Sequence, residues 1–489
     1  MILKNYKQTK SLSIFKGLSL AFLVNSIFIP HLIQINYHPF SSEVLLFFIS
    51  LFIPMYILGY FINWKFYLLI STLSSYWFLD SYFIKDEHFY ILIIFLIIFF
   101  CYINFLDKIF FPKTISIFCI FFILFSIINF KSEILINEKL IKNENNNITN
   151  SKFSYLHIIL DEHSSLNLLP EKFKDESFNK KFEKDYISNN FKLYNSVFSE
   201  SPNTRKSLGA IFGLYDDKEV KKVRIGNYEQ KNNKFTYSLK KNFLTERLKK
   251  NNLEVSFIQS TYLEICDKLN SYKCETYNRA ANMHIFKKYN IGIVQRLKIA
   301  ALSLHQNFYH KGHEVFLYKK IINIFNKNEL RSYGYFSRPL VNLYIFDKIK
   351  DRVKNLKKGE ALIAHMMLPH FPYVLDENCN LKRIKDWNYP FRHNKNETEL
   401  SAHTGFLEQT KCTHKKVSSI LKIASKKDNL IVVIHGDHGA RLFLNTKLEN
   451  KIDNTSTFVA LKGIETVPEV IEENLKLQNI FVKFFDKYF

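Results

Sequence analysis

The first 130 residues alternate between long apolar stretches and short polar connections. Five apolar stretches stand out, at Gly17–Tyr37, Ser42–Asn63, Lys65–Leu79, His88–Phe105 and Thr114–Phe130. A helix needs about 20 apolar residues to cross the hydrocarbon core of a membrane. We therefore expect a transmembrane region of about five helices over residues 1–130, in which the third and shortest stretch carries three serines.

The pattern changes after this region. Lys131–Ser154 is polar and rich in asparagine, which is typical of a linker. Short apolar runs then predict strands at Tyr155–Leu160, Glu254–Gln259, Ala361–Met367 and Leu430–Ile434. Helical patterns run through Leu239, Phe243, Leu244 and Leu248 before the second strand and over Gly405–Ser425 before the last. This alternation predicts an α/β domain over residues 155–489, with a central mostly parallel sheet flanked by helices.

The charges of the connections predict how the chain is oriented. Four lysines precede the first apolar stretch, whereas the connection His38–Ser41 has no Lys or Arg. Basic residues favour the cytoplasmic side of a membrane, so the N-terminus is expected inside and, after five crossings, the α/β domain outside. No small-residue cleavage site follows the first stretch, which indicates an anchor and not a signal peptide.

The net charge of +23 lies mainly after residue 130 and suits acidic partners such as anionic lipid headgroups or phosphorylated glycans. A general bias towards Lys, Asn and Ile is the alternative explanation. The basic residues are scattered, no nucleic-acid-binding motif is present, and the domain is expected outside. We therefore expect no nucleic-acid partner.

The chain has six cysteines: Cys101, Cys119, Cys266, Cys274, Cys379 and Cys412. The first two lie in apolar stretches, and the other four permit three disulfide pairings. Close spacing favours Cys266 with Cys274, which leaves Cys379 with Cys412. None of them has zinc-ribbon spacing, and disulfides would fit an oxidising compartment.

Polar residues at the strand ends are the first candidates for a site, because ligands of parallel sheets gather beyond the carboxyl ends of the strands. Asp161 and Glu162 follow the first predicted strand. His365 lies in the third strand and His370 follows it. The motif His435-Gly-Asp-His-Gly-Ala-Arg441 follows the last strand, and its two end residues are expected to orient their neighbours.

A further candidate is Thr204, in the run Ser201-Pro-Asn-Thr-Arg. Pro and Asn favour a helix start near Thr204, and backbone N–H groups at a helix start favour an anion. Carboxylates and imidazoles bind divalent cations such as Zn²⁺ or Mn²⁺, and such a cation makes a nearby hydroxyl nucleophilic. The structural alternatives are a simple helix cap for Thr204 and a buried structural histidine for His365.

These motifs resemble the alkaline phosphatase superfamily, which includes the sulfatases. The shared features are Asp437-His438-Gly439 after a strand, an acid that ends the first strand, and a Thr in a Ser-Pro-Asn-Thr turn. A helical anchor with an external domain is similar to the lipid A phosphoethanolamine transferases and the lipoteichoic acid synthases. By this resemblance, a divalent metal ion, Zn or Mn, is bound by Asp161, Thr204, Asp437 and His438, and the substrate is contacted by His365 and His370.

The resemblance also implies a reaction. A phosphoryl-linked headgroup of the phosphoethanolamine or phosphoglycerol type would move from a membrane phospholipid to an envelope glycan or lipid through a covalent Thr204 intermediate. The protein would be a multi-pass protein of the bacterial inner (cytoplasmic) membrane, with its C-terminal domain periplasmic or extracellular. One alternative is a hydrolase of phosphate or sulfate esters, although Thr204 cannot become the formylglycine of many sulfatases. A non-catalytic envelope protein that binds glycans or acts as a scaffold is the other.

Overall fold

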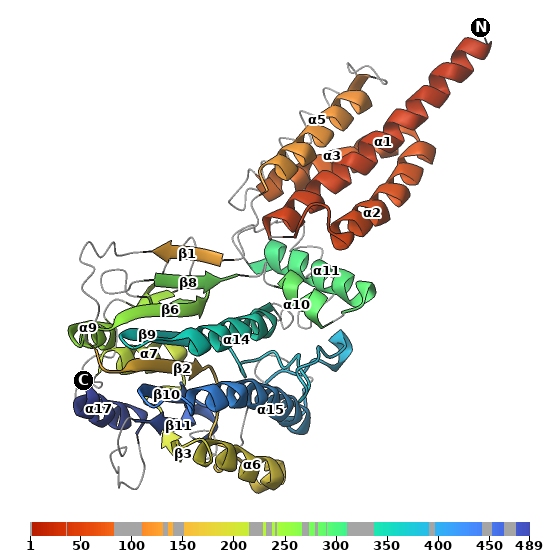
Figure 1. Cartoon of the computed structure of the whole chain (residues 1–489). Helices are drawn as coiled ribbons and strands as arrows, with labels where there is room; N and C mark the ends of the chain where they lie inside the picture. The colour runs from red at the N-terminus through yellow and green to blue at the C-terminus, as the bar shows by residue number, and fades with distance from the viewer. Residues whose placement is uncertain are drawn as a thin grey trace. The chain divides into compact units, whose positions relative to one another are not determined.

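The computed structural model describes residues 2–35, 37–82, 110–130, 135–139, 151–214, 228–230, 237–239, 242–266, 273–278, 282–289, 291–310, 337–390, 397–442, 452–463 and 476–489. The chain forms two compact units (Figure 1). The first, here called the membrane unit, comprises Met1–Glu133 and Asn290–Gly334. The second, here called the sheet unit, comprises Ile134–Tyr289 and Tyr335–Phe489.

Five helices of the membrane unit lie in the described residues. They are α1 (Ile2–Gln34), α2 (Ser42–Phe61), α3 (Trp64–Tyr82), α5 (Phe110–Ile128) and α11 (Ile293–His310). Three of these contain segments that are long and apolar enough to cross a membrane: Lys10–Gln34, Ser42–Phe61 and Phe110–Ile128. The membrane unit is thus helical, as the sequence predicts.

The expected number of five crossings is corrected to three candidate spans within the described part of the chain. The third apolar stretch does form a helix, α3, but this helix is not among the candidate spans. Its hydroxyl-bearing residues, among them Ser71 and Thr72, lower its apolar character. The fourth expected stretch, His88–Phe105, lies outside the described residues.

Helices α1 and α5 run in the same direction. Near the start of α5, the Lys113 ammonium lies 4.6 Å from the centre of the Phe15 ring. Beyond the ends of the two helices, the rings of His38 and Phe130 lie 5.5 Å apart. The start of α1 and the end of α5 therefore lie at opposite ends of the membrane unit.

The sheet unit is built on an eight-stranded sheet with the order β1-β8-β6-β9-β2-β10-β11-β3. The strands are β1 (Leu135–Lys139), β2 (Ser154–Leu160), β3 (Lys192–Phe198), β6 (Glu254–Ser260), β8 (Lys273–Tyr277), β9 (Glu360–Met366), β10 (Leu430–Gly436) and β11 (Ser456–Lys462). The five strands from β8 to β10 are parallel, and antiparallel pairs complete both edges. This confirms the mostly parallel sheet and the four predicted strands. A small second sheet pairs β4 (Tyr228–Gln230), β5 (Tyr237–Leu239) and β7 (Leu263–Glu264).

Helices cover both faces of the large sheet. On one face, α7 (Thr204–Phe212), α9 (Phe243–Lys250) and α17 (Leu477–Tyr488) pack against the apolar residues of β2 and β10. On the other face lie α14 (Ser337–Asn355) and α15 (Glu399–Ala424), joined by α6 (Glu176–Ile187) and α10 (Asn282–Lys288) (Figure 1). Strands that are buried on both faces read as continuous apolar runs, which is why β2 and β10 were recognisable in the sequence.

Three details differ from the sequence-based expectations. Leu239 belongs to strand β5, and the helix expected to run through it begins only at Phe243, where the Asn242 side chain accepts a hydrogen bond from the Thr245 N–H group at 3.0 Å. Strand β1 lies inside the expected linker and pairs with β8. Asn290–Gly334 joins the membrane unit. The domain boundaries 1–130, 131–154 and 155–489 stay a prediction.

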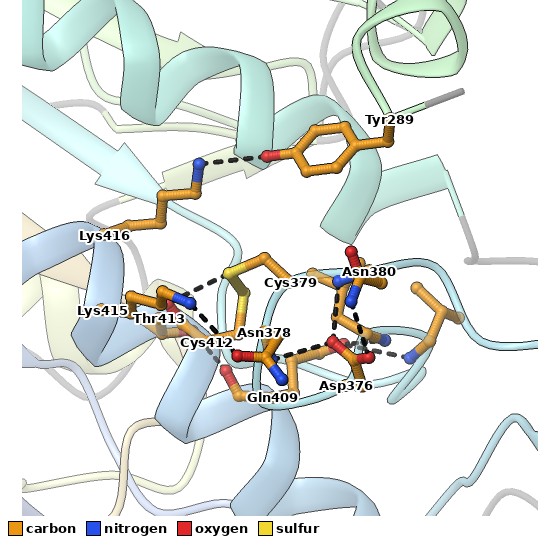
Figure 2. The surroundings of a disulfide bond; sticks show 12 residues. Tyr289, Asp376, Asn378, Cys379, Asn380, Gln409, Cys412, Thr413, Lys415 and Lys416 are labelled. Carbon is orange, nitrogen blue, oxygen red and sulfur yellow. Dashed lines mark hydrogen bonds between the residues drawn. A yellow bond between two sulfur atoms is a disulfide. The ribbon is translucent and has the colours of Figure 1, made fainter. Parts of the chain in front are cut away.

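Both expected disulfides are present, Cys266–Cys274 and Cys379–Cys412. The second links the turn after β9 to helix α15 (Figure 2). Cys119 is a buried free thiol in α5, and Cys101 lies outside the described residues.

Candidate metal centre and active site

The carboxyl ends of β2 and β10 bring three buried side chains together. The two strands are parallel neighbours, and Leu160 pairs with Gly436 at their ends. Asp161 follows β2, while Asp437 and His438 follow β10. One ligand atom from each of these three side chains lies within 4.8 Å of the other two. Three of the four metal ligands implied by the resemblance thus form one cluster.

Two glycines allow the chain to turn at the end of β10. A Cβ atom at Gly436 would collide with the carbonyl oxygen of His163, and one at Gly439 would collide with that of Asp453. Only glycine permits such a close approach of backbone to backbone. The two residues between the glycines are therefore held in place by packing on both sides.

The carboxylate of Asp437 has one satisfied oxygen and one open oxygen. Its Oδ1 accepts hydrogen bonds from the backbone N–H groups of Glu162 and His438, at 2.9 and 2.8 Å. Its Oδ2 is buried and has no hydrogen-bond partner in the described residues, and the same holds for Oδ2 of Asp161. Burying a carboxylate oxygen without a partner is costly, so this pair fits a bound cation.

The imidazole of His438 is oriented for the same purpose. Its Nδ1 donates to the carbonyl oxygen of Gly439 at 2.8 Å, which leaves the Nε2 lone pair facing the carboxylates. Nε2 lies 3.4 Å from Asp437 Oδ2 and 3.9 Å from Asp161 Oδ1. Burial, together with the charge of Arg441, lowers the pKa of His438 to about 4. A neutral imidazole held by a backbone carbonyl is the form that binds a metal.

The buried carboxyl groups of Asp161 and Asp437 lie close together, so ionising both without a cation is unfavourable. Burial and the neighbouring charge of Asp161 raise the pKa of Asp437 well above its usual range. Burial alone would raise the pKa of Asp161 too, but His370, His365 and His438 outweigh it and lower that pKa. The two pKa values therefore move apart, and Asp437 is the carboxyl that takes up a proton more readily. A divalent cation would replace that proton.

Thr204 lies beside this cluster as the first residue of α7. The side chain of Asn203 caps the helix by accepting from the Arg205 N–H group at 3.1 Å, so Thr204 is not the cap. Its buried hydroxyl lies 3.1 Å from Nε2 of His438 and donates to Oδ1 of Asp161 at 3.3 Å. The predicted helix start is confirmed, and the fourth residue of the expected ligand set borders the other three.

Ser207 supports this arrangement and was not singled out from the sequence. Its Oγ donates to the backbone carbonyl of Asp437 at 2.6 Å, which ties α7 to the end of β10. Residues three apart share one face of a helix. The spacing of three residues between Thr204 and Ser207 therefore indicates that both side chains lie on the same face of the helix.

The histidines expected to contact the substrate lie on the β9 side of the cluster. Nε2 of His365 is 3.6 Å from Oδ2 of Asp161, longer than a hydrogen bond, and Nε2 of His370 is 3.6 Å from Oε1 of Glu162. Glu162 itself is buried and forms an ion pair with the partly exposed Arg441. Glu162 is thus a neighbour of the cluster and not one of its three members.

His435 points into the core beneath the cluster. Its Nδ1 donates to the carbonyl oxygen of Gly436 at 2.8 Å, so its Nε2 accepts from Nε2 of His157 at 2.9 Å. Nδ1 of His157 in turn accepts from the hydroxyl of Tyr155 at 3.1 Å. Burial lowers the pKa of His435 to about 3. His435 is thus a hydrogen-bonded residue of the core and is not in the three-residue cluster, and its expected role of orienting its neighbours stays a prediction.

Tyr262 and Arg338 are further neighbours that the sequence analysis missed. Burial and the charge of Asp161 raise the pKa of Tyr262 to about 12. The guanidinium of Arg338 lies 4.9 Å from the centre of the Tyr262 ring. Tyr262 follows the predicted strand Glu254–Gln259, so its place at a strand end was the available signal, whereas Arg338 lies in helix α14 and follows no predicted strand.

No protein-family model and no curated protein sequence matches the chain. Among solved structures, the lipooligosaccharide phosphoethanolamine transferase A of Neisseria meningitidis, an integral membrane protein, is 10% identical with a TM-score of 0.37, over 97% of this chain and 95% of that chain. A lipoteichoic acid synthase of Listeria monocytogenes is 12% identical with a TM-score of 0.30, over 66% and 67%. The sulfatase PsFucS1 of Pseudoalteromonas sp. is 12% identical with a TM-score of 0.35, over 68% and 67%.

Solved structures similar to this chain thus include the three kinds of enzyme that its motifs resemble.

Proposed function

We propose that the chain is a metal-dependent transferase that moves a phosphoryl-linked headgroup from a membrane phospholipid to an envelope glycan or lipid. The observation that carries this proposal is the position of the Thr204 hydroxyl. It lies at the start of a helix, within 3.3 Å of Asp161 and 3.1 Å of His438. A buried hydroxyl between a carboxylate and a neutral imidazole is placed to become a nucleophile.

In this proposal Asp161, Thr204, Asp437 and His438 hold a divalent cation, Zn²⁺ or Mn²⁺. When bound, the cation lowers the pKa of the threonine hydroxyl and offsets the charge of the phosphoryl group. The mixed oxygen and nitrogen ligands suit either ion.

In this proposal each site residue has its own role in the transfer reaction. Thr204 gives up its hydroxyl proton, which points at Oδ1 of Asp161. Its Oγ1 attacks phosphorus and forms a covalent ester, while the bond to the lipid oxygen breaks. The N–H groups at the start of α7 face the negative charge of the phosphoryl group. His365 and His370 contact its other oxygens. A proton for the leaving oxygen would come from an imidazolium form, since the Nδ1–H group of His370 already donates to the Phe371 carbonyl. In the second half, a hydroxyl of the acceptor displaces Thr204.

The anchored layout supports transfer at a membrane surface. A lipid donor is confined to the bilayer, and three candidate spans keep the catalytic unit of the same chain close to it. We accordingly place the protein in the bacterial inner membrane, with the sheet unit in the periplasm or outside the cell. Hydrolysis of phosphate or sulfate esters by the same residues is the competing reaction that the experiment must separate.

The test uses the full-length protein in lipid with a donor labelled in its headgroup. Thr204→Ala should lower turnover by at least about 10³-fold, as removal of a nucleophile does, whereas Thr204→Ser should keep part of it. Lys206→Ala, an exposed change on the same helix, should stay within about twofold of wild type. Mass spectrometry should find the label first on a peptide containing Thr204 and then on the acceptor.

Release of the label mainly to water would identify a hydrolase. Unimpaired turnover by Thr204→Ala would eliminate the nucleophile. If the wild type gives neither a labelled peptide nor turnover, the result would favour the alternative of a non-catalytic envelope protein.

A further inference from the structure

A single buried side chain of α15, Gln409, contacts five backbone groups of the segment that carries His370. We call residues 368–375 the His370 loop. The oxygen of the Gln409 amide accepts from the N–H groups of Val374 and Leu375, at 3.0 and 3.3 Å. Its nitrogen donates to the carbonyl oxygens of Pro369, His370 and Pro372, at 3.0, 2.9 and 3.3 Å.

The His370 loop depends on such a contact because it is buried without being a strand. All eight of its residues are buried. Buried backbone groups must find hydrogen-bond partners, and the two prolines, Pro369 and Pro372, have no N–H group to offer a neighbouring strand. Towards α15 the loop presents both carbonyl oxygens and N–H groups. An amide is a neutral side-chain group that accepts through its oxygen and donates through its nitrogen.

The opposite side of the same loop faces the candidate active site. Nδ1 of His370 donates to the carbonyl oxygen of Phe371 at 2.6 Å, and its Nε2 lies 3.6 Å from Oε1 of Glu162. The N–H group of Phe371 donates to Oε2 of Glu162 at 3.5 Å. The loop is therefore held between Glu162 on the site side and Gln409 behind it.

A covalent link fastens the next part of the chain to the same helix. Cys379 is bonded to Cys412, which follows Gln409 by three residues, and Figure 2 shows both attachment points on α15. Between them, the Asp376 carboxylate accepts from the N–H groups of Asn378 and Asn380, at 2.9 and 2.7 Å. The turn after the His370 loop is thus also attached to α15, and a shift of the loop relative to α15 would break its contacts with Gln409.

We propose that Gln409 is a positioning residue that sets His370 in the active site through the backbone of the His370 loop. The five hydrogen bonds of the Gln409 side chain all go to this loop, and none goes to the three-residue cluster or to Thr204. Its effect on turnover is therefore expected to pass through this loop, and His370 is the loop residue that the proposed function places at the substrate. The part of this inference that concerns turnover rests on the proposed function.

The test compares two substitutions and one control in the full-length protein. Gln409→Met keeps the length of the side chain and removes all five hydrogen bonds. Gln409→Glu keeps the oxygen that accepts from Val374 and Leu375 and replaces the donor. Thr410→Val removes a buried hydroxyl without a hydrogen-bond partner in the described residues from the same helix turn. We expect kcat/KM to fall at least tenfold in Gln409→Met, less in Gln409→Glu, and within twofold in Thr410→Val, with unchanged metal content in all three.

A double substitution separates positioning from general stability. If Gln409 acts through His370, adding Gln409→Met to His370→Ala should change kcat/KM less than twofold, because coupled residues are not additive. An equal loss in both backgrounds would overturn the proposal. So would wild-type turnover by Gln409→Met.

Hydrogen exchange decides the matter if Gln409→Met fails to fold or if no turnover is found in the wild type. In the wild type, peptides covering the His370 loop should exchange slowly, and Gln409→Glu should speed their exchange at least fivefold while β9 keeps its protection. Fast exchange in the wild-type loop, or no change in Gln409→Glu, would refute the positioning role. Absence of turnover in the wild type would refute the proposed function only. The positioning role of Gln409 would then be judged from hydrogen exchange.

Discussion

Replacing Asp437 by asparagine removes one charge of the candidate metal centre and keeps its shape. The asparagine oxygen can still accept from the N–H groups of Glu162 and His438, as Oδ1 does now. The amide nitrogen takes the place of Oδ2, which has no hydrogen-bond partner in the described residues. The substitution therefore resembles the protonated, metal-free state of Asp437.

The size of the effect follows from the distance between the charges. Ligand atoms of Asp161 and Asp437 lie within 4.8 Å of one another, and two like charges at that distance repel by about 3.5 kcal/mol at an effective dielectric constant of about 20. Because the pKa of Asp437 is raised on folding, its contribution to stability is present at low pH and is lost as pH rises above the unfolded value of about 4. The amide introduced by Asp437→Asn does not titrate, so the metal-free variant should be the more stable protein at pH 8.

Bound metal should make wild type more stable than Asp437→Asn. A cation at about 100 times its dissociation constant stabilises the folded protein by about 2.7 kcal/mol. Taking about 2 °C per kcal/mol for a large domain, wild type should gain about 5 °C in thermal midpoint on addition of Zn²⁺ or Mn²⁺. Asp437→Asn should gain less than about 1 °C on the same scale. The control Asp486→Asn changes an exposed aspartate that pairs with Arg247 and should respond like wild type.

The assay is thermal unfolding of the full-length protein at pH 6 and pH 8, after chelation and after addition of either ion. Two results would refute the reasoning. One is a metal-free Asp437→Asn that is less stable than metal-free wild type at both pH values. The other is an equal metal-induced shift in the two proteins.

Three further predictions concern the disulfides, the buried histidines and the topology. The cysteines of Cys379–Cys412 are 33 positions apart and those of Cys266–Cys274 are 8 apart, which corresponds to about 3.7 and 2.5 kcal/mol of loop-closure entropy. Cys412→Ser should therefore lower the denaturation midpoint more than Cys266→Ser, and four free thiols in non-reducing peptide maps would exclude both bridges. Burial lowers the pKa of His435 to about 3, so its stability contribution is complete above about pH 6.5 and is lost as pH falls. His435→Gln should accordingly reduce the pH slope of the unfolding free energy by about 1.4 kcal/mol per pH unit between pH 4 and 6, and an unchanged slope would contradict this. A phosphatase fused after Phe489 should be active and a cytoplasm-only fluorescent reporter dark, whereas the reverse would place the sheet unit inside.

The strands that carry the site could be predicted because each leaves a local trace. β2 and β10 are apolar along most of their length and are followed by acids, so Asp161 and Asp437 were visible as candidates. Their adjacency was implied by the family resemblance and not by any local pattern. The two residues are far apart in the chain, and only the sheet order places β10 beside β2. Local patterns thus predicted the members of the cluster and the edge at which they lie, but not their pairing.

What the sequence left out depends on long-range contacts. A glutamine in the middle of α15 looks like an ordinary polar helix position, and nothing local shows that Gln409 is fully buried against the His370 loop. Leu239 fits the spacing of a helix and nonetheless pairs in β5 with Tyr228. Strand β1 lies in a polar region that predicted a linker, and its place in the sheet comes from pairing with β8. In each case a partner distant in sequence decides the conformation.

The number of membrane crossings matters less to the proposed topology than the direction of two helices. α1 and α5 run in the same direction, with Phe15 beside Lys113 near their starts and His38 beside Phe130 beyond their ends. Two spans that cross a membrane in the same direction have an odd number of other crossings between them, so the count from α1 to α5 is odd whatever lies between the two. The chain after Phe130 then emerges on the side opposite the lysine-rich N-terminus. Since that N-terminus is expected in the cytoplasm, the external position proposed for the sheet unit holds with three crossings as well as with five.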